Sequence, residues 1–250
     1  FYGEPKTGDL DEAKNIEQVG GKVSDSITEA VEKVNAERKE YWNDIEAKAS
    51  KIDQQIYTHL EISAEAQDEL QTEIKLRTGG SDEPYNDVEK EELVQDLVHH
   101  FAMEAIREED DGIVPLHGVD DQPNMLDRIV ERFEDAYGEH AEDRLVEVDD
   151  ILGATSAAEE AYPNLRTWLK EDLFDYHVSK FDRVPILWRF TTERLVSDGE
   201  GEGFGCLVDY HQMGEGVFDR LQNRYLEPRK NLLRERRSAA NRRRSDDSLS

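Results

Sequence analysis

The sequence has almost no cysteine: Cys206 is the only one in 250 residues. A single thiol cannot form an internal disulfide, and it excludes zinc sites built from several cysteines. Because Cys206 lies within an apolar, strand-like run, we predict that it is a small buried residue.

Long apolar runs are absent as well. No stretch approaches the ~20 apolar residues that cross a bilayer, and no charged segment followed by an apolar one marks a signal peptide at the N-terminus. We therefore expect a cytoplasmic protein with no membrane partner.

Basic residues are scarce, with 31 Lys and Arg against 59 Asp and Glu, for a formal net charge of −28. Such a balance fits either a disordered, self-repelling chain or a folded protein with a strongly acidic surface. The regular spacing of the apolar residues favours the folded protein. Dense surface carboxylates are typical of organisms with high internal salt, where charge repulsion is screened over a few ångströms, so we expect a halophilic source. The first residue is Phe1 rather than Met, and we expect a piece of a longer protein.

Glycines alternate in the stretch SDGEGEGFG, residues 197–205. A phosphate-binding loop connects a strand to a helix, so that backbone N–H groups and the helix dipole face the phosphate. Here the glycines lead into an apolar strand-like run, no lysine is present, and Asp198, Glu200 and Glu202 would repel phosphate. The stretch therefore predicts a turn and not a nucleotide site.

The longest periodic segment is a predicted coiled-coil-like helix at 23–62, after a loose lead-in at 1–22 and with Ser24 as the expected N-cap. Its side chains recur at steps of three and four, which keeps one face apolar except at Arg38. A helix this long is expected to need a partner helix, either a second copy or the segment 216–237. The members of this stripe are Ile27, Val31, Val34, Arg38, Tyr41, Ile45, Ala49, Ile52, Ile56 and Leu60.

A helical region is predicted at 63–183, with a loop at 108–123 and with Asn86 capping one helix with Glu89 at the capping-box position. The helices of this region are predicted at 64–77, 87–107, 124–137, 139–152 and 164–180.

The pattern then changes to period two at 184–212, where VPILWRF and FGCLVDY predict a β-hairpin. Its structural residues are Pro185, Trp188, Phe190, Leu207 and Tyr210, and we expect Trp188 to be buried against Leu207. A last helix is predicted within 213–237, kinked or broken at Pro228, followed by a basic, then polar, disordered tail at 238–250. The predicted fold class is mainly α, α+β at most.

The residues with catalytic potential form no recognisable site. The histidines lack metal-ligand spacing: His99 and His100 are adjacent and diverge on a helix, and a site from His177 and His211 has little support. We expect His99 to be a partly buried polar group. Carboxylates occur everywhere, and no serine lies in a nucleophile-elbow context. We predict no catalytic, cofactor-binding or metal-binding residue in this chain.

One segment runs against the acidic background. Between positions 228 and 244, eight basic residues face one acidic residue, Glu235, so the net charge is +7. The segment either folds back on the acidic surface of the protein or contacts a phosphate backbone. The candidate DNA-binding residues are Arg229, Lys230, Arg234, Arg236, Arg237, Arg242, Arg243 and Arg244.

The hairpin sequences RVPILWRF (183–190) and FGCLVDYH (204–211) resemble a paired element near the C-terminus of the PglX-type adenine-specific DNA methyltransferases of BREX phage-defence systems and their Type IIG restriction-modification relatives. DQQIYTHLEIS (53–63) and LVQDLVHHFAMEAIREEDDGIVPL (93–116) resemble preceding segments in the same order. Two residues depart from the family pattern. Val184 stands between Arg183 and Pro185, which are adjacent in the family, and Asp209 stands where an apolar residue is usual.

The resemblance implies a haloarchaeal enzyme that transfers a methyl group from S-adenosylmethionine to adenine N6. The cofactor loop and the Asn-Pro-Pro-Tyr motif of that family are absent from this chain, which has no Pro-Pro pair. The expected function is therefore that of a C-terminal structural and DNA-engaging segment without a catalytic core. Its implied partners are DNA and the remainder of the methyltransferase or other defence-system subunits. The alternative is an independent acidic scaffold or adaptor protein that acts through coiled-coil pairing.

Overall fold

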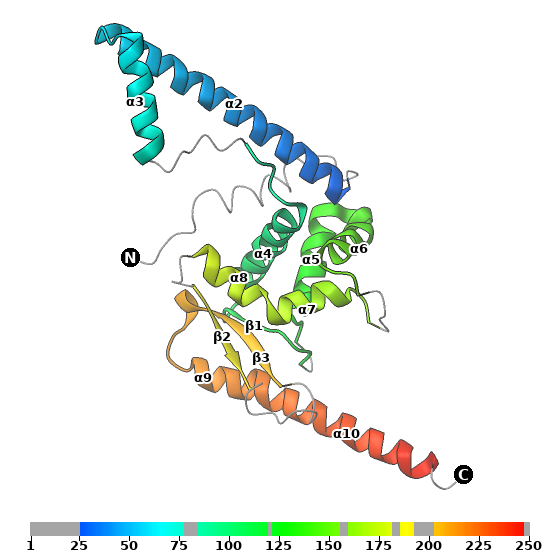
Figure 1. The fold of residues 1–250 in the computed structure, drawn as a ribbon. Helices are drawn as coiled ribbons and strands as arrows, with labels where there is room; N and C mark the ends of the chain where they lie inside the picture. Colours follow the sequence, from blue (N-terminus) through cyan, green and yellow to red (C-terminus); the bar gives the residue numbers. More distant parts are fainter. Residues whose placement is uncertain are drawn as a thin grey trace.

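The computed structural model describes residues 26–77, 85–119, 122–155, 160–181, 186–192 and 203–247, without side chains beyond 239. A long helical arm, a helical body and a small sheet follow one another from top to bottom, and a C-terminal helix covers the far side of the sheet (Figure 1). The protein is mainly helical, as the sequence predicts.

The arm consists of α2 (Ile27–His59) and α3 (Ala64–Arg77). The N-cap of α2 is Ser26, whose hydroxyl accepts from the backbone of Glu29 while the Glu29 carboxylate accepts from the backbone of Ser26. This capping box satisfies two otherwise unpaired backbone donors. The predicted cap, Ser24, lies outside the described residues.

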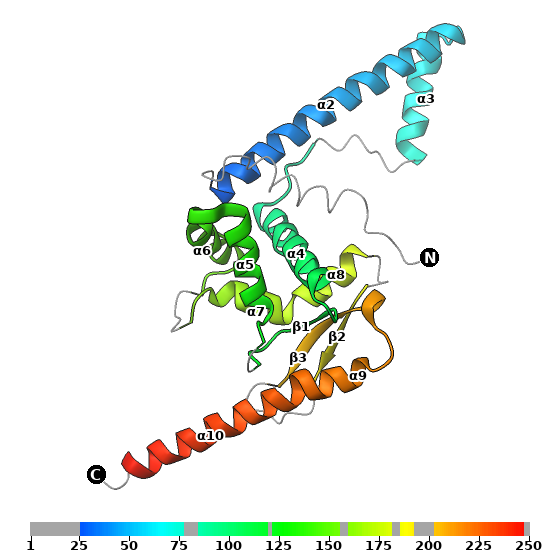
Figure 2. The same ribbon diagram turned by 180° about the vertical axis from the view of Figure 1, so that it is seen from behind.

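The apolar stripe of α2 divides into a buried and an exposed part. Ile27, Val31 and Val34 are buried in the body, where α2 contacts α4 and α6. From Tyr41 onward the large apolar residues of the stripe are exposed. Figures 1 and 2 place α2 and the C-terminal helix at opposite ends of the molecule, so the predicted pairing with 216–237 does not occur within one chain.

The body is built around α4 (Lys90–Glu108), which is apolar on most of its circumference and buried over most of its length, as a central helix must be. Its N-cap is Glu89, without a side-chain hydrogen bond, rather than Asn86 with a capping box. Around α4 lie α5 (Met125–Tyr137), a 3-10 turn, α6 (Ala141–Leu152), α7 (Pro163–Glu171) and α8 (Leu173–Lys180). The single helix predicted at 164–180 is thus two helices that meet at Asp172.

The sheet has three antiparallel strands in the order β1-β3-β2. The predicted hairpin is confirmed as β2 (Leu187–Thr191) and β3 (Gly205–Asp209), with Trp188 opposite Val208. A third strand, β1 (Ile113–Pro115), lies in the predicted loop 108–123. Three residues that end in proline are too short to show period-two alternation, so β1 forms only because β3 offers it a free edge.

The two faces of the sheet join two apolar clusters. Val114, Leu187 and Leu207 belong to the cluster formed by the body helices. Cys206 and its alternate neighbours on the sheet belong to a second cluster, with side chains from the C-terminal helices. The sheet is therefore the middle layer between the body and the C-terminal helix.

The C-terminal layer comprises α9 (Val217–Arg220), a π-helical turn η4 (Leu221–Leu226) and α10 (Glu227–Asp247). The irregularity predicted at Pro228 takes the form of this π turn, in which the N–H of Glu227 bonds to the carbonyl of Gln222. Helix α10 continues to Asp247, where the sequence predicts a disordered tail from 238. Among the described helices, none combines the length and apolarity that a bilayer crossing requires.

The hairpin residues behave differently from one another. Leu207 is fully buried, but Trp188 is 48% exposed, so the predicted burial of Trp188 is wrong. Strand β2 lies at the sheet edge, and the Trp188 ring stacks on Tyr210 with a centroid distance of 6.1 Å. Phe190 packs edge-on against Phe218 of α9. Pro185 lies outside the described residues.

This difference in burial predicts that two substitutions lower the free energy of unfolding by different amounts. Leu207→Ala is expected to destabilise the protein by about 2–5 kcal/mol, because it leaves a cavity between the layers. Trp188→Ala is expected to cost less, about 0.5–1.5 kcal/mol for the aromatic pair and a similar amount for the half-buried ring, without a cavity in the core. Guanidinium unfolding of both variants measures the difference. A Trp188 variant less stable than the Leu207 variant contradicts this placement.

Candidate nucleic-acid interface

Three contacts hold the C-terminal layer to the loop before β1 and to the residues after it. The Tyr225 hydroxyl lies 3.0 Å from both carboxylate oxygens of Asp111, and Arg224 Nη1 donates to Asp111 at 2.9 Å. Asp111 also accepts from the backbone of Ile113. Further along, Arg229 Nη1 donates to the carbonyl of Gly118 at 2.7 Å. These contacts set the direction in which α10 leaves the sheet.

Arg229 is therefore a structural residue. Its side chain is 3% exposed and bonded to Gly118, so it cannot contact DNA as the sequence predicts. The spacing of charges along the sequence carries no information about which arginine lies beneath the helix. Lys230, the next residue, is exposed and forms an ion pair with Glu227 at 2.8 Å.

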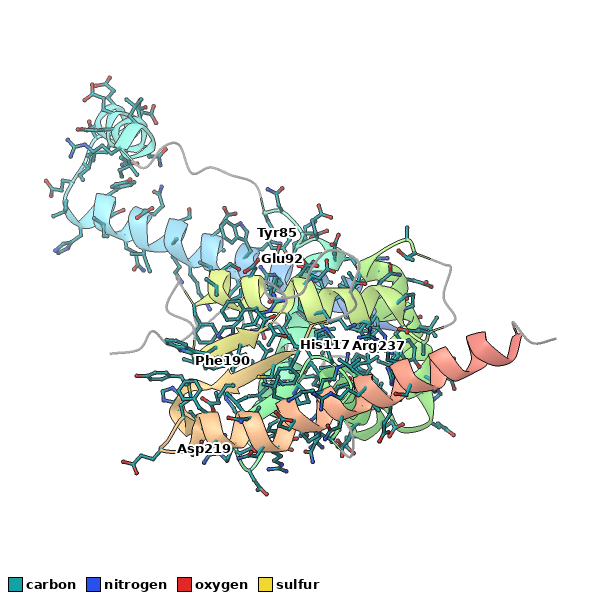
Figure 3. All side chains as sticks on the ribbon, turned by 90° about the horizontal axis from the view of Figure 1, so that it is seen from below. Tyr85, Glu92, His117, Phe190, Asp219 and Arg237 are labelled. Carbon is teal, nitrogen blue, oxygen red and sulfur yellow. The ribbon has the colours of Figure 1, made fainter. Side chains whose placement is uncertain are left out.

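The remaining described candidates lie on the free part of α10. Arg234, Arg236 and Arg237 are exposed, and the helix extends beyond the body toward the C-terminus (Figure 1). Figure 3 shows Arg237 on this helix, nearer to the C-terminus of the chain than Asp219 of α9. Positions 242, 243 and 244 follow on the same helix, and their side chains lie outside the described residues. The structure thus presents an exposed arginine cluster, Arg234, Arg236 and Arg237, on one helix.

The body holds a buried histidine pair that the sequence does not reveal. His99 on α4 and His177 on α8 are 3% and 0% exposed, and His99 Nε2 lies 3.0 Å from His177 Nδ1. His177 Nε2 accepts from the backbone N–H groups of Ile186 and Leu187. Because Nε2 accepts, Nδ1 carries the proton and donates to His99. The pair joins the start of β2 to the body.

Burial controls the ionisation of this pair. It lowers the pKa of His99 to about 3, with further lowering by the charges of His177 and Lys180. Burial also lowers the pKa of His177 to about 4, and Arg107 adds to this effect. Both rings are neutral near pH 7, so the pair has a structural role. Within the described residues, no group of three His, Cys, Asp or Glu side chains is arranged to hold a metal ion.

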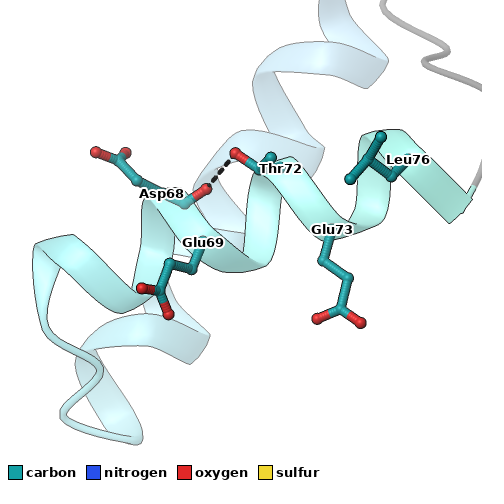
Figure 4. A pocket seen from close by; sticks show the side chains of 5 residues that line it. All are labelled: Asp68, Glu69, Thr72, Glu73 and Leu76. Carbon is teal, nitrogen blue, oxygen red and sulfur yellow. Dashed lines mark hydrogen bonds between the residues drawn. The ribbon is translucent and has the colours of Figure 1, made fainter.

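Two surface hollows in the described residues are acidic. One is a shallow hollow on α3, lined by Asp68, Glu69, Glu73, Thr72 and Leu76 (Figure 4). The hydroxyl of Thr72 donates to the carbonyl of Asp68 there. A second hollow, between α2, α4 and α6, is lined by four acidic side chains against Lys90. Neither of these two hollows suits a phosphate-bearing ligand, in contrast to the exposed arginines of α10.

Comparison with known proteins adds no relative: the sequence matches no protein-family model and no curated protein.

Proposed function

We propose that this chain is the C-terminal structural and DNA-engaging segment of an adenine-specific DNA methyltransferase, of the PglX type or its Type IIG relatives. The observation that carries the DNA contact is the arginine cluster of α10, which is exposed on a helix anchored by Asp111 and Gly118. The rest of the protein is strongly acidic, so this helix is where phosphate oxygens would bind.

The segments that resemble the methyltransferase family support the enzyme class by their position. Residues 93–116 form α4 and β1, and the two hairpin segments form β2 and β3, so all three meet in the sheet and its central helix. Gly112 in this set has φ +64°, and a Cβ there would lie 2.8 Å from Gln212 Cβ. The sequence at this turn therefore needs glycine.

The proposed contact is electrostatic and independent of DNA sequence. Guanidinium groups on a helix bind phosphate oxygens and position the duplex without reading bases. At ~1 M salt the Debye length is about 3 Å, so the charge of −28 repels DNA little, but counterion release also contributes little. The helix therefore positions DNA that is held mainly by the rest of the enzyme. S-adenosylmethionine and the flipped adenine would bind that remainder and not this chain.

A second candidate function is an adaptor that acts through coiled-coil pairing and never meets DNA. The exposed apolar residues of α2 favour it. The gene distinguishes the two functions: upstream of Phe1, a methyltransferase gene encodes a glycine-rich cofactor loop and an Asn-Pro-Pro-Tyr motif. A reading frame that starts near residue 1, without such a neighbour, contradicts the methyltransferase proposal.

Replacing Arg234, Arg236 and Arg237 by serine is expected to weaken DNA binding by the protein encoded by the whole gene. Each lost phosphate contact removes ~0.9 from the slope of log K against log salt, so the slope should fall by about 3. Affinity should fall equally for unrelated duplexes, and the methylated site should stay the same. Fluorescence anisotropy at several salt concentrations measures both quantities.

The matched control replaces three exposed basic residues of the arm and body, Lys39, Arg77 and Lys90, by serine. It changes the net charge by the same amount without touching α10. If the α10 variant binds DNA with the same affinity and salt slope as this control, the arginine cluster does not contact DNA.

A further inference from the structure

The outer part of α2 carries a row of large apolar side chains in solvent. Tyr41, Ile45, Ile52 and Ile56 are 67%, 61%, 55% and 46% exposed. The segment around Tyr85 contacts the flank of this row: the Tyr85 hydroxyl donates to the carbonyl of Asn35, and the Tyr85 ring lies 6.3 Å from that of Trp42. Helix α3 diverges from α2 (Figure 1), and within the described part of the chain these side chains stay exposed. A contiguous apolar row of this kind marks an interaction surface.

The spacing of the row is self-complementary. Tyr41 and Ile52 are 11 residues apart, as are Ile45 and Ile56. An 11-residue repeat corresponds to about 3.67 residues per turn, so the row runs nearly straight along the helix. Ala49 lies at its centre. An antiparallel copy whose two-fold axis passes between Lys48 and Ala49 places Ile45 against Ile52 and Tyr41 against Ile56, and each contact occurs twice about that axis.

The charges around the row also suit a second copy. Residues 38–53 contain four basic and four acidic side chains, so this surface is neutral in a protein of net charge −28. A strongly basic partner would find little attraction here, whereas a second acidic copy meets less repulsion here than it would at a surface with the average charge of the protein. In the antiparallel register Asp44 lies near Lys51 of the other copy on one flank, but Glu46 lies near Asp53 on the other. Added salt should screen that repulsion and tighten the pairing.

The length of the row is sufficient for pairing. The row from Tyr41 to Ile56 covers 16 residues, roughly 24 Å at 1.5 Å per residue, and it lies within the segment 36–59, which extends beyond the body. We propose that two copies of this chain associate through an antiparallel pairing of their α2 helices, centred between Lys48 and Ala49. This surface is separate from α10, and its test does not depend on DNA binding.

Disulfide trapping tests the register in the 250-residue chain with Cys206 replaced by serine. Equal amounts of an Ile45→Cys and an Ile52→Cys protein are mixed and oxidised in about 1 M potassium chloride. The antiparallel register predicts mainly the mixed disulfide, whereas a parallel register predicts disulfides between identical variants. The matched control is Val146→Cys, an exposed position on α6 that should not cross-link. Absence of the mixed product, or its equal abundance with the control, overturns the proposal.

Sedimentation equilibrium provides the second measurement. The parent chain should dimerise, more tightly as salt increases, and Ile45→Asp should raise the dissociation constant at least ~100-fold, since each dimer contains the substitution twice. Because Ile45 is mainly exposed, the variant should keep its helicity by circular dichroism. Val146→Asp should dimerise like the parent. A monomeric parent chain, or an Ile45→Asp chain that dimerises normally, contradicts the pairing.

Discussion

Asp111→Ala is expected to destabilise the protein by about 2–3 kcal/mol. The Asp111 side chain is 7% exposed and accepts hydrogen bonds from Tyr225, Arg224 and the backbone of Ile113. Removing Asp111 leaves the backbone N–H of Ile113 without its partner, whereas Tyr225 keeps a bond to the carbonyl of Ile113 and the half-exposed Arg224 can bind water. Chemical denaturation measures the loss of unfolding free energy.

The same substitution should also loosen the C-terminal layer, because Tyr225 and Arg224 hold it to Asp111. Amide exchange should therefore rise across 217–247 more than in α4. Tyr225→Phe, which removes only the hydroxyl, should cost about 1–2 kcal/mol. The control Asp150→Ala removes an exposed carboxylate and should change stability little. An Asp111 variant as stable as the Asp150 variant shows that the network does not anchor the layer.

Acidification from pH 6.5 to 4.5 is expected to remove about 4 kcal/mol of stability through His99 and His177. Their pKa values are lowered to about 3 and about 4 in the folded protein, so both stay neutral while their unfolded counterparts become protonated. The unfolded state then binds more protons than the folded state. The free energy of unfolding therefore decreases as the pH is lowered, by up to about 1.4 kcal/mol per pH unit for each histidine. This contribution is complete above pH 6.5 and is lost as pH falls toward the folded pKa values.

His99→Gln separates this contribution from that of the many carboxylates. The glutamine carbonyl can still accept from His177, but the group no longer titrates. The pH dependence of the variant should be smaller than that of the parent by about half of the histidine contribution, while the carboxylate contribution cancels in the comparison. Direct titration of the ring protons by NMR checks the pKa values. Identical pH dependence in the two proteins would show that His99 titrates normally in the folded state.

The residues that the sequence places correctly are those whose structure depends on near neighbours. The long helix and the pairing of β2 with β3 each follow from spacing over a few residues. The same local signal cannot predict an element that is short or that is stabilised only by contacts with residues distant in the sequence. Strand β1 and the break at Asp172 belong to that class.

The candidate site shows the same limit. The sequence identifies the basic segment but cannot separate Arg229, which is buried against Gly118, from Arg234, which is exposed. Both are arginines on one helix, and they differ only in whether another part of the chain lies beside them. His99 and His177 are 78 residues apart, and no pattern in the sequence joins them.

The sequence alone determined the helical class, the acidic surface, the basic C-terminal segment and the apolar row of α2, because composition and periodicity are properties of the chain itself. The tertiary structure decided which part of the apolar stripe of α2 is buried and that Trp188 on β2 is half exposed. It also decided which arginines of the basic segment are exposed to solvent. Those outcomes depend on which elements become neighbours. Neighbours distant in the sequence are selected by the burial of the whole core and not by any local pattern.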